Sequence, residues 1–357
     1  MPNYSILHKQ DIFITEKYEP DIRRDELSFL SRSFERHFNE RPYLHHACYL
    51  FLTKTPKERS RQQSNWNTLC RGFLVPKEIR DKETVERFME AVGQFESIVN
   101  DSGLIRLERL TTEEITGTEN EPGIIERYLT LSADGTTMLQ DMQLNPDEMR
   151  IGDKRLCLHT LSDLDDLPGK VKTDGRYERL STDRSDCRLS YAAPVGVMLP
   201  CDHIYNQWIF IDDSNENLSR FEKAAKNMQS LSRYSRSNQI NKEWLDEYLN
   251  EAHTNGLQSV RCHCNIIAWA ENGDELRRVK NDVGSALALM ECTPHHNTTD
   301  LPALYWAGIP GNEADFPAEE TFYTFTGQAL CFFTAETCYR NSLSPFGIRM
   351  VDRLTGK

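Results

Sequence analysis

Cysteine and histidine residues come together in one part of the sequence, in a way that could hold a metal ion or activate a thiol. Cys262 and Cys264 flank His263, and segment 292–296 adds Cys292 and two histidines. Thiolates and imidazoles are the usual ligands of tetrahedral zinc. Neighbouring side chains of a strand point to opposite faces, so Cys262 and Cys264 would share a face that His263 does not reach. We therefore predict buried free thiols and no metal ligand.

The same thiols leave an alternative open, a metal- or thiol-dependent hydrolase that uses Cys262, Cys264 and Cys292 with nearby histidines. Cys48 also follows two histidines, at 45–46, within a pattern typical of a strand. A nucleophile needs a base within hydrogen-bonding distance, which the sequence alone does not show. We therefore interpret these residues as core packing and assign no catalytic or cofactor-binding residue.

Three aspartates, Asp163, Asp165 and Asp166, have the carboxylates of a calcium or magnesium loop. A calcium loop of the EF-hand type needs a further oxygen ligand and a glycine at the next two positions. Leu167 and Pro168 occupy those positions. The segment therefore indicates a solvated turn.

A run of basic residues suggests a contact with DNA phosphates, and a DNA-contacting module is a further alternative. The run consists of Arg220, Lys223, Lys226, Arg233, Arg236 and Lys242, with Tyr234 and Trp244 interleaved. Helical spacing places the first three opposite Phe221 and Met228, as on an ordinary solvated helix face. The formal charge of −13 also opposes DNA binding, so we do not expect nucleic acid as a partner.

The composition is typical of a globular protein, with 38% hydrophobic and 27% charged residues in 357. No apolar run approaches the ~20 residues that a membrane span requires. Residues 1–10 lack the apolar core of a signal peptide. Ten cysteines spread along a long chain indicate free thiols in a reducing cytosol.

Alternation between extended apolar runs and helical periodicity predicts an α+β fold. Strands are expected at 8–15, 49–53, 104–110, 155–161, 188–198, 204–211 and 257–270. Helices are expected at 25–39, after an Asp81 cap as far as Gly103, at 113–131 with an interruption at 121–123, at 217–231, at 240–249 and after an Asp274 cap. This order predicts two split-βαβ (ferredoxin-like) sandwiches, at 1–133 and 204–343, with a β-rich connector at 134–203 and a linker at 344–357.

Several longer runs carry a family resemblance. They are segments 30–42, 150–153 and 231–236, Trp306-Ala-Gly-Ile-Pro-Gly-Asn312, and Pro345-Phe-Gly-Ile-Arg-Met-Val-Asp-Arg-Leu-Thr-Gly-Lys357. In these runs the chain resembles the N-terminal region of the TraG conjugation ATPase of Bacteroides-type conjugative transposons, a member of the type IV secretion ATPase family. The resemblance covers essentially the whole chain, which we expect to begin inside the family's N-terminal domain.

In that family, the phosphate-binding loop lies a few tens of residues beyond the Thr-Gly-Lys segment. A loop of this kind needs G-x-x-x-x-G-K-[ST], and Val351 stands where the first glycine would be before Gly356 and Lys357. The resemblance therefore implies an N-terminal region without its motor, so we expect no enzyme activity and no cofactor in this chain. ATP and magnesium are expected in the motor domain of the full-length parent, an ATPase.

The resemblance also implies a function in DNA transfer by conjugation. We expect a docking and assembly module that positions the motor on the secretion apparatus. Its expected partners are the conjugation and secretion proteins at the inner membrane and its own motor domain, and self-association is left open. The expected location is cytoplasmic and peripheral to the inner membrane, through partner proteins.

Overall fold

The computed structural model describes most of the chain. The described residues are 3–18, 29–56, 81–103, 105–119, 121–132, 140–145, 148–171, 175–178, 181, 188–231, 236–295 and 300–334. The predicted linker at 344–357 lies outside them.

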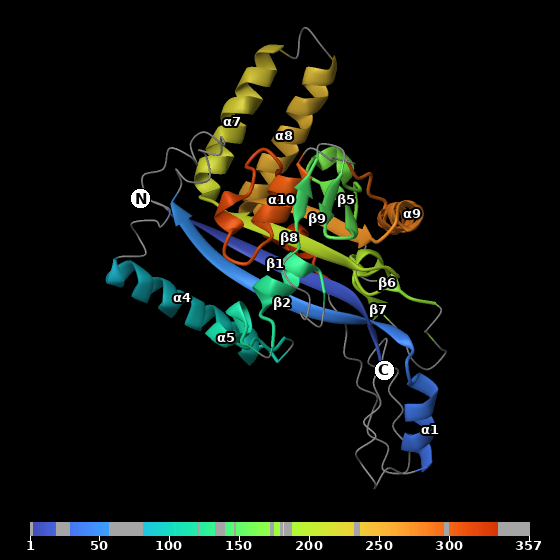
Figure 1. The fold of residues 1–357 in the computed structure, drawn as a ribbon. Helices are drawn as coiled ribbons and strands as arrows, with labels where there is room; N and C mark the ends of the chain where they lie inside the picture. The colour runs from blue at the N-terminus through green and yellow to red at the C-terminus, as the bar shows by residue number, and fades with distance from the viewer. Residues whose placement is uncertain are drawn as a thin grey trace, which may run out of the picture.

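One antiparallel sheet of eight strands forms the centre of the molecule (Figure 1). Its order is β2 (Pro42–Pro56), β1 (Asn3–Lys17), β8 (His203–Ile211), β9 (Ser259–Ala270), β5 (Lys154–Leu161), β4 (Met149–Ile151) and β3 (Met142–Leu144), with β10 (Phe322–Phe325) also paired to β9. A separate two-stranded sheet pairs β6 (Gly175–Arg176) with β7 (Arg188–Leu189).

Helices lie on both faces of this sheet and beyond its ends. The α-helices are α1 (Phe29–Phe38), α4 (Lys82–Asp101), α5 (Thr112–Thr116), α6 (Ile124–Thr130), α7 (Ser214–Leu231), α8 (Arg236–Asn255), α9 (Gly273–Leu289), α10 (Leu301–Ala307) and α11 (Thr326–Leu330). Short 3-10 helices are η2 (Leu164–Asp166), η3 (Ala193–Val195) and η4 (Glu313–Asp315). Helices α7 and α8 form a hairpin that projects from the sheet (Figure 1).

The alternation of side chains along the strands gives the sheet two apolar faces. On one face, Trp208, Ile267 and Trp269 pack in a core cluster with α6 and α10. Those helices are joined there by a reciprocal pair of bonds, in which the hydroxyls of Tyr128 and Tyr305 each donate to the other's carbonyl oxygen at 2.9 Å.

Helix α9 covers the other face of the sheet. Leu276, Val283 and Leu287 of this helix pack in one core cluster with Ile266 and Ala268 of β9. Each large apolar side chain buried in this way contributes ~1.5–3 kcal/mol. The two layers together hold β9 in the centre of the structure.

The α+β prediction is confirmed, but the strands do not divide into two sandwiches and a connector. Residues 1–133 supply β1 and β2, residues 134–203 supply β3, β4 and β5, and residues 204–343 supply β8, β9 and β10 to one sheet. The physical reason is edge pairing: β1 pairs with β8, and β5 pairs with β9. An edge strand presents unpaired backbone groups that are satisfied when another strand pairs with it.

Two predicted strands are wrong. Segment 105–110 forms no ladder among the described residues, and Leu107 is held instead by Asn100, whose Oδ1 accepts from the Leu107 amide at 2.7 Å. In 188–198 the ladder stops at Leu189, and η3 follows. Pro194, in the first turn of η3, has no N–H to donate to a ladder, which is consistent with this ending.

The two predicted caps also differ from the structure. Asp81 is the N-cap residue of α4, but its carboxylate accepts from the Thr84 hydroxyl at 2.5 Å and not from a backbone amide. Helix α9 begins earlier than predicted, and its cap is Asn272, whose Oδ1 accepts from the Glu275 amide at 2.9 Å. Asp274 is therefore the second residue of the helix and not its cap.

Candidate functional site

The thiols of β9 lie where the strand pattern predicts. Cys262 packs with Ile209 and Phe322, and Cys264 packs on the same face with Cys292. His263 points to the opposite face, against Trp208. The prediction of buried free thiols is confirmed for these three cysteines.

Burial determines the protonation of these thiols. It raises the pKa of Cys264 to about 12 and also raises the pKa values of Cys262 and Cys292. A thiolate is the form that attacks substrates and binds metals, and these thiols remain protonated at neutral pH. Among the residues that the structure describes, no three His, Cys, Asp or Glu side chains come close enough to hold a metal ion.

The aspartate segment forms a turn, as predicted. The carboxylate of Asp166 accepts from the amides of Ser162 at 3.0 Å and Asp163 at 2.9 Å, which closes the 3-10 turn η2. Nε2 of His295 lies 2.8 Å from the other oxygen of Asp166. His296 lies outside the described residues. The turn therefore holds His295 beside the edge of β5.

A charged cluster that the sequence did not indicate lies on β1 and β2. Asp11 is fully buried and forms an ion pair with Lys9, while Nε2 of His46 donates to it at 3.0 Å. Gln207 donates at 3.1 Å and the Thr334 hydroxyl at 2.8 Å. Burial alone would raise the pKa of Asp11, but the hydrogen bond from His46 and the charge of Lys9 hold it well below its usual range. The carboxylate is therefore ionised.

Cys48 lies opposite Asp11 in the β1–β2 register, so the His-His-x-Cys pattern belongs to this cluster. Cys48 is exposed at the surface, so the core packing predicted for it is wrong. Loss of water around its sulfur atom and the negative charge of Asp11 nevertheless raise the pKa of Cys48 to about 12. The nearby His46 is turned toward Asp11 and stacks on Phe13, with ring centroids 4.3 Å apart. The cluster therefore provides a fixed ion pair and no activated thiol.

A directional chain of hydrogen bonds crosses the opposite face. Gln10 donates to Asn206 at 2.9 Å, and Asn206 donates to Asn265 at 3.1 Å. The Asn265 amide then lies 3.0 Å from Nε2 of His263, whose Nδ1 lies 2.6 Å from the Glu320 carbonyl oxygen. Burial lowers the pKa of His263 to about 3, so the ring is neutral. The chain positions β10 and the Glu320 turn against the sheet.

The predicted basic run is divided between α7 and α8, and part of it lies outside the described residues. Arg220 donates to the Tyr323 hydroxyl at 2.8 Å, Lys242 pairs with Asp246 at 3.1 Å, and Lys223 and Lys226 are exposed on α7. Arg233 and Tyr234 lie outside the described residues. Arg236 and Trp244 lie on α8, where Trp244 is 62% exposed.

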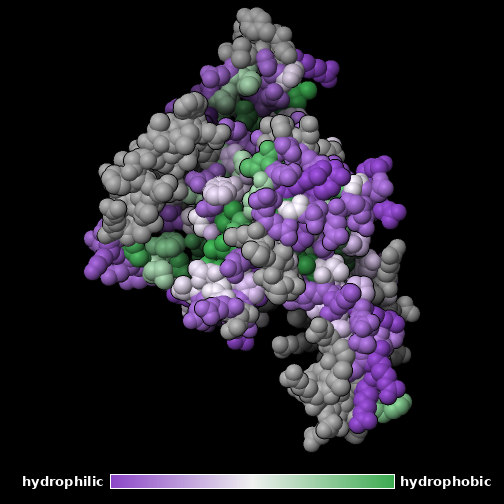
Figure 2. All heavy atoms as spheres, viewed as in Figure 1, coloured by the Kyte–Doolittle hydropathy of each residue, from purple (hydrophilic) through white to green (hydrophobic). Residues whose placement is uncertain are grey.

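Helix α4 carries the clearest exposed apolar surface. None of its residues is buried, although Val85, Met89 and Ile98 are large and apolar. Their exposed fractions are 38%, 48% and 71%. The helix lies at the lower left of the molecule in Figure 1, and hydrophobic residues reach the surface in this region of Figure 2. The sequence did not distinguish this surface from a helix face that packs in the core, because both have the same apolar periodicity.

Comparisons with protein-family models and with curated protein sequences find no match. The family relationship therefore stays a prediction, based on the sequence runs described above. Within the described part of the chain, no helix is long and apolar enough to cross a membrane.

Proposed function

We propose that this chain is a docking and assembly module of a conjugative-transfer ATPase of the type IV secretion family. The observation that carries the proposal is an apolar seam along α4 that stays at least partly exposed, since no residue of this helix is buried. Val85, Phe88, Val92, Phe95 and Val99 follow one another at alternating spacings of three and four residues. This is the spacing of a helix that packs along another helix. An amphipathic helix of this kind also fits an apolar groove on a partner.

The energetics of α4 favour association. Burial of an exposed Leu- or Met-sized side chain contributes ~1.5–3 kcal/mol. Contiguous exposed apolar residues are uncommon on monomeric proteins and mark interaction surfaces. Val85, within the seam, is 38% exposed, and Met89 and Ile98 flank the seam on its two sides.

Under this proposal, the partners are secretion proteins at the inner membrane, the motor domain of the full-length parent, and a second copy where the assembly is oligomeric. ATP and magnesium bind in that motor domain. Segment 344–357 would connect to it and lies outside the described residues. The module itself would be cytoplasmic and reach the inner membrane through its partners.

The alternatives gain less support. A thiol-dependent hydrolase would need an ionised cysteine, whereas burial raises the pKa values of Cys262, Cys264 and Cys292. A DNA-contacting module would need basic residues on one face, whereas Arg220 and Lys242 are engaged with Tyr323 and Asp246. No observation of the described residues favours either function over docking.

The test replaces the apolar face of α4 with charge. We expect Val85→Glu combined with Val92→Lys, two seam residues that share one side of α4, in the full-length parent, to weaken co-purification with inner-membrane conjugation proteins by about tenfold or more. Conjugal transfer should fall with it. The matched control exchanges two exposed charges of the same helix, Lys82→Glu with Glu90→Lys, and should leave both readouts unchanged. Equal co-purification of the two double variants would overturn the proposal.

A further inference from the structure

The outer face of α8 carries an exposed pair of large side chains. Ile240 and Trp244 lie one helical turn apart and are 37% and 62% exposed. The opposite face of α8 packs on α7 and on β10, where Tyr248 stacks on Phe325 with ring centroids 4.3 Å apart. Because the core holds that opposite face, Ile240 and Trp244 stay at the surface of the molecule.

The position of this pair makes it accessible to a partner. Helices α7 and α8 form the hairpin that projects from the sheet (Figure 1). Leu249 and Ala252 are buried in the half of α8 nearer the sheet, whereas Ile240 and Trp244 lie in the half nearer the turn of the hairpin. Tryptophan is among the residues that most often dominate the binding energy of a protein interface.

Acidic residues continue the same face of α8. Glu247 and Glu251 follow Trp244 by three and seven residues, which places them on one side of an α-helix, and Glu243 lies beside them. All three glutamates are exposed. Among the described residues none of them forms an ion pair, and Glu243 accepts a hydrogen bond from the Gln239 amide at 3.1 Å. The face is therefore negative beside its apolar pair, which complements a basic partner.

The length and order of this face define the shape of the partner. Ile240 and Glu251 are eleven residues apart in the helix, which corresponds to about 16 Å. Three turns of a second α-helix span the same length. The apolar pair lies toward the start of α8, next to the single basic residue Arg236, and the carboxylates lie toward its end. A matching helix therefore has apolar residues at one end of its contact face and basic residues at the other.

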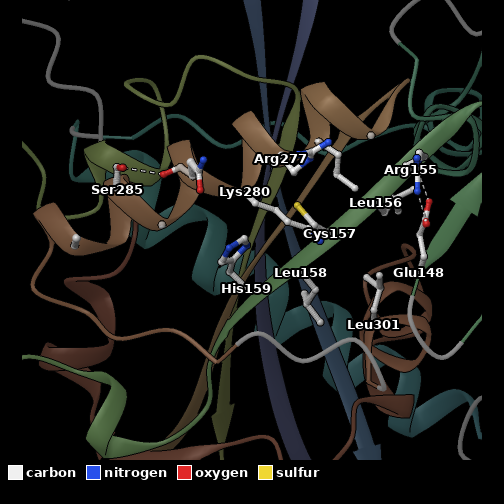
Figure 3. A pocket seen from close by; sticks show the side chains of 15 residues that line it. Glu148, Arg155, Leu156, Cys157, Leu158, His159, Arg277, Lys280, Ser285 and Leu301 are labelled. Carbon is white, nitrogen blue, oxygen red and sulfur yellow. Dashed lines mark hydrogen bonds and ion pairs between the residues drawn. The ribbon is translucent and has the colours of Figure 1, made fainter.

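The groove between β5 and α9 offers no equivalent site for a basic segment (Figure 3). Arg155, Arg277 and Lys280 line it, against one carboxylate, Glu148. Figure 3 shows this carboxylate paired with Arg155, at 2.7 Å. A basic segment would meet cations there and no free carboxylate, so the charges of the two surfaces direct it to α8.

We propose that the outer face of α8 binds a basic amphipathic helix of a partner protein. Apolar side chains of that helix cover Ile240 and Trp244, and its Lys or Arg side chains lie against Glu247 and Glu251. The apolar contact supplies most of the affinity, and the charges select the partner and its direction. The site is separate from α4 and does not depend on the function proposed for that helix.

The experiment uses the whole chain and a fluorescently labelled helical peptide of Ala, Leu and Lys, with Leu and Lys on one face. We expect binding in anisotropy measurements, and we expect it to weaken when salt is raised from low to physiological ionic strength. A peptide with Glu in place of each Lys should not bind. Equal binding of the two peptides would contradict the selection by charge.

A pair of tryptophan variants locates the apolar contact. Trp244→Ala should weaken peptide binding at least tenfold, as expected when the central aromatic residue of an interface is removed. The matched control is Trp306→Ala, which removes a tryptophan of similar exposure, 55%, from α10. It should bind the peptide normally. Circular dichroism checks that both variants are folded.

A pair of charge variants locates the ionic contact. Glu247→Lys combined with Glu251→Lys should weaken binding at least tenfold and remove most of its dependence on salt. The control, Glu86→Lys combined with Glu90→Lys, makes the same change in charge at the same spacing on the exposed side of α4. It should bind the peptide with nearly unchanged affinity.

The outcomes separate this proposal from its alternatives. Equal binding by the two tryptophan variants would overturn it, even if the charge variant lost binding, because the contact would then be simple attraction between charges. Self-association of the chain that Trp244→Ala abolishes, without peptide binding, would also overturn it in favour of a second copy as the occupant. Val85→Glu with Val92→Lys should bind the peptide normally, so loss of transfer in that variant tests docking through α4 alone.

Discussion

Polar side chains occupy the middle of both faces of the sheet, where a burial cost must be offset by hydrogen bonds. On one face, Gln10 of β1 meets Asn206 of β8, and on the other Asp11 meets Gln207. A shift of one residue in the pairing would move each of these side chains to the opposite face. Unpaired, each would cost ~1–3 kcal/mol or more. The polar pairs therefore fix the register of β1 against β8.

The buried ion pair between Lys9 and Asp11 also constrains the fold. Removal of one partner of a buried pair leaves an uncompensated charge, which typically costs ~3–5 kcal/mol. Lys9 and Asp11 lie two residues apart in β1, and Thr334 bonds both of them, Lys9 at 2.6 Å and Asp11 at 2.8 Å. The cluster therefore ties a residue near the end of the described chain to the first strand.

His263 leads to a prediction about pH. Burial lowers its folded pKa to about 3, whereas an unfolded histidine has a pKa of about 6.5. Between these values the unfolded chain binds the additional proton. The contribution of His263 to stability, fully present above pH ~6.5, should therefore fall by ~1.4 kcal/mol per pH unit as pH drops toward 3, in addition to a similar contribution from His203, whose pKa burial lowers to about 4. Urea unfolding at a series of pH values measures this slope.

The control is His263→Gln, which has an amide donor but does not titrate. Its unfolding free energy should depend less steeply on pH between 6 and 4, by the same ~1.4 kcal/mol per unit. The ring signals of His263 in NMR spectra should also remain those of the neutral form at pH 5. Parallel pH profiles for the two proteins would show that the folded ring protonates as easily as an unfolded one.

At this scale the sequence predicted the buried thiols, because alternation along one strand places Cys262 and Cys264 together. It did not indicate the polar chain or the Asp11 cluster. Gln10 and Asn206 are 196 residues apart, and a polar residue in an apolar strand looks the same whether or not a partner faces it. The sequence shows where these polar residues lie along the strands, but not which of them pair.

Among the elements, α9 offers a direct test of how helices begin in this fold. Asn272 caps the helix through the Glu275 amide, and Asp274 lies within the first turn. We expect Asn272→Ala to lower the unfolding free energy by about 1 kcal/mol, which is typical of a lost N-cap. Asp274→Ala should cost only a few tenths, since it removes an exposed charge near the helix N-terminus. Urea denaturation of both variants measures the difference, and equal losses would contradict the assignment of the cap.

Several long elements were predicted well, but only residues 49–53 of the long strand β2 were predicted, and short elements were predicted poorly. Helices α7 and α9 and strands β8 and β9 each have many residues with consistent periodicity, so no local alternative competes. Segment 105–110 alternates like a strand, yet in the structure it lies beside α4, where Asn100 contacts its backbone. Propensity indicates that a segment is extended, but whether it pairs depends on which edge is within reach.

The whole molecule is organised around the central pair β8–β9, with strands from earlier in the chain on both sides. β1 pairs with β8 from Ser5 to Phe13, and β5 pairs with β9 from Arg155 to Leu161. The sequence indicates the strands but not their order, because pairing across ~200 residues leaves no local pattern. That is why two sandwiches were predicted where one sheet exists.

A protein built on one sheet is expected to fold differently from a protein built of two separate sandwiches. If the segments formed separate cores, residues 204–334 would fold when produced alone. In the structure, β8 and β9 each need a neighbour from the first 203 residues to cover their backbone groups and to complete the clusters around Trp208 and Trp269.

We therefore expect segments 1–203 and 204–334, produced separately, to lack native near-ultraviolet circular dichroism. The full chain should instead unfold in one transition, with tryptophan fluorescence and far-ultraviolet dichroism coinciding. A native-like spectrum from either segment alone would mean that the pairing of β1 with β8 and of β5 with β9 adds to cores that already exist, and the sheet would then be an assembly of two domains.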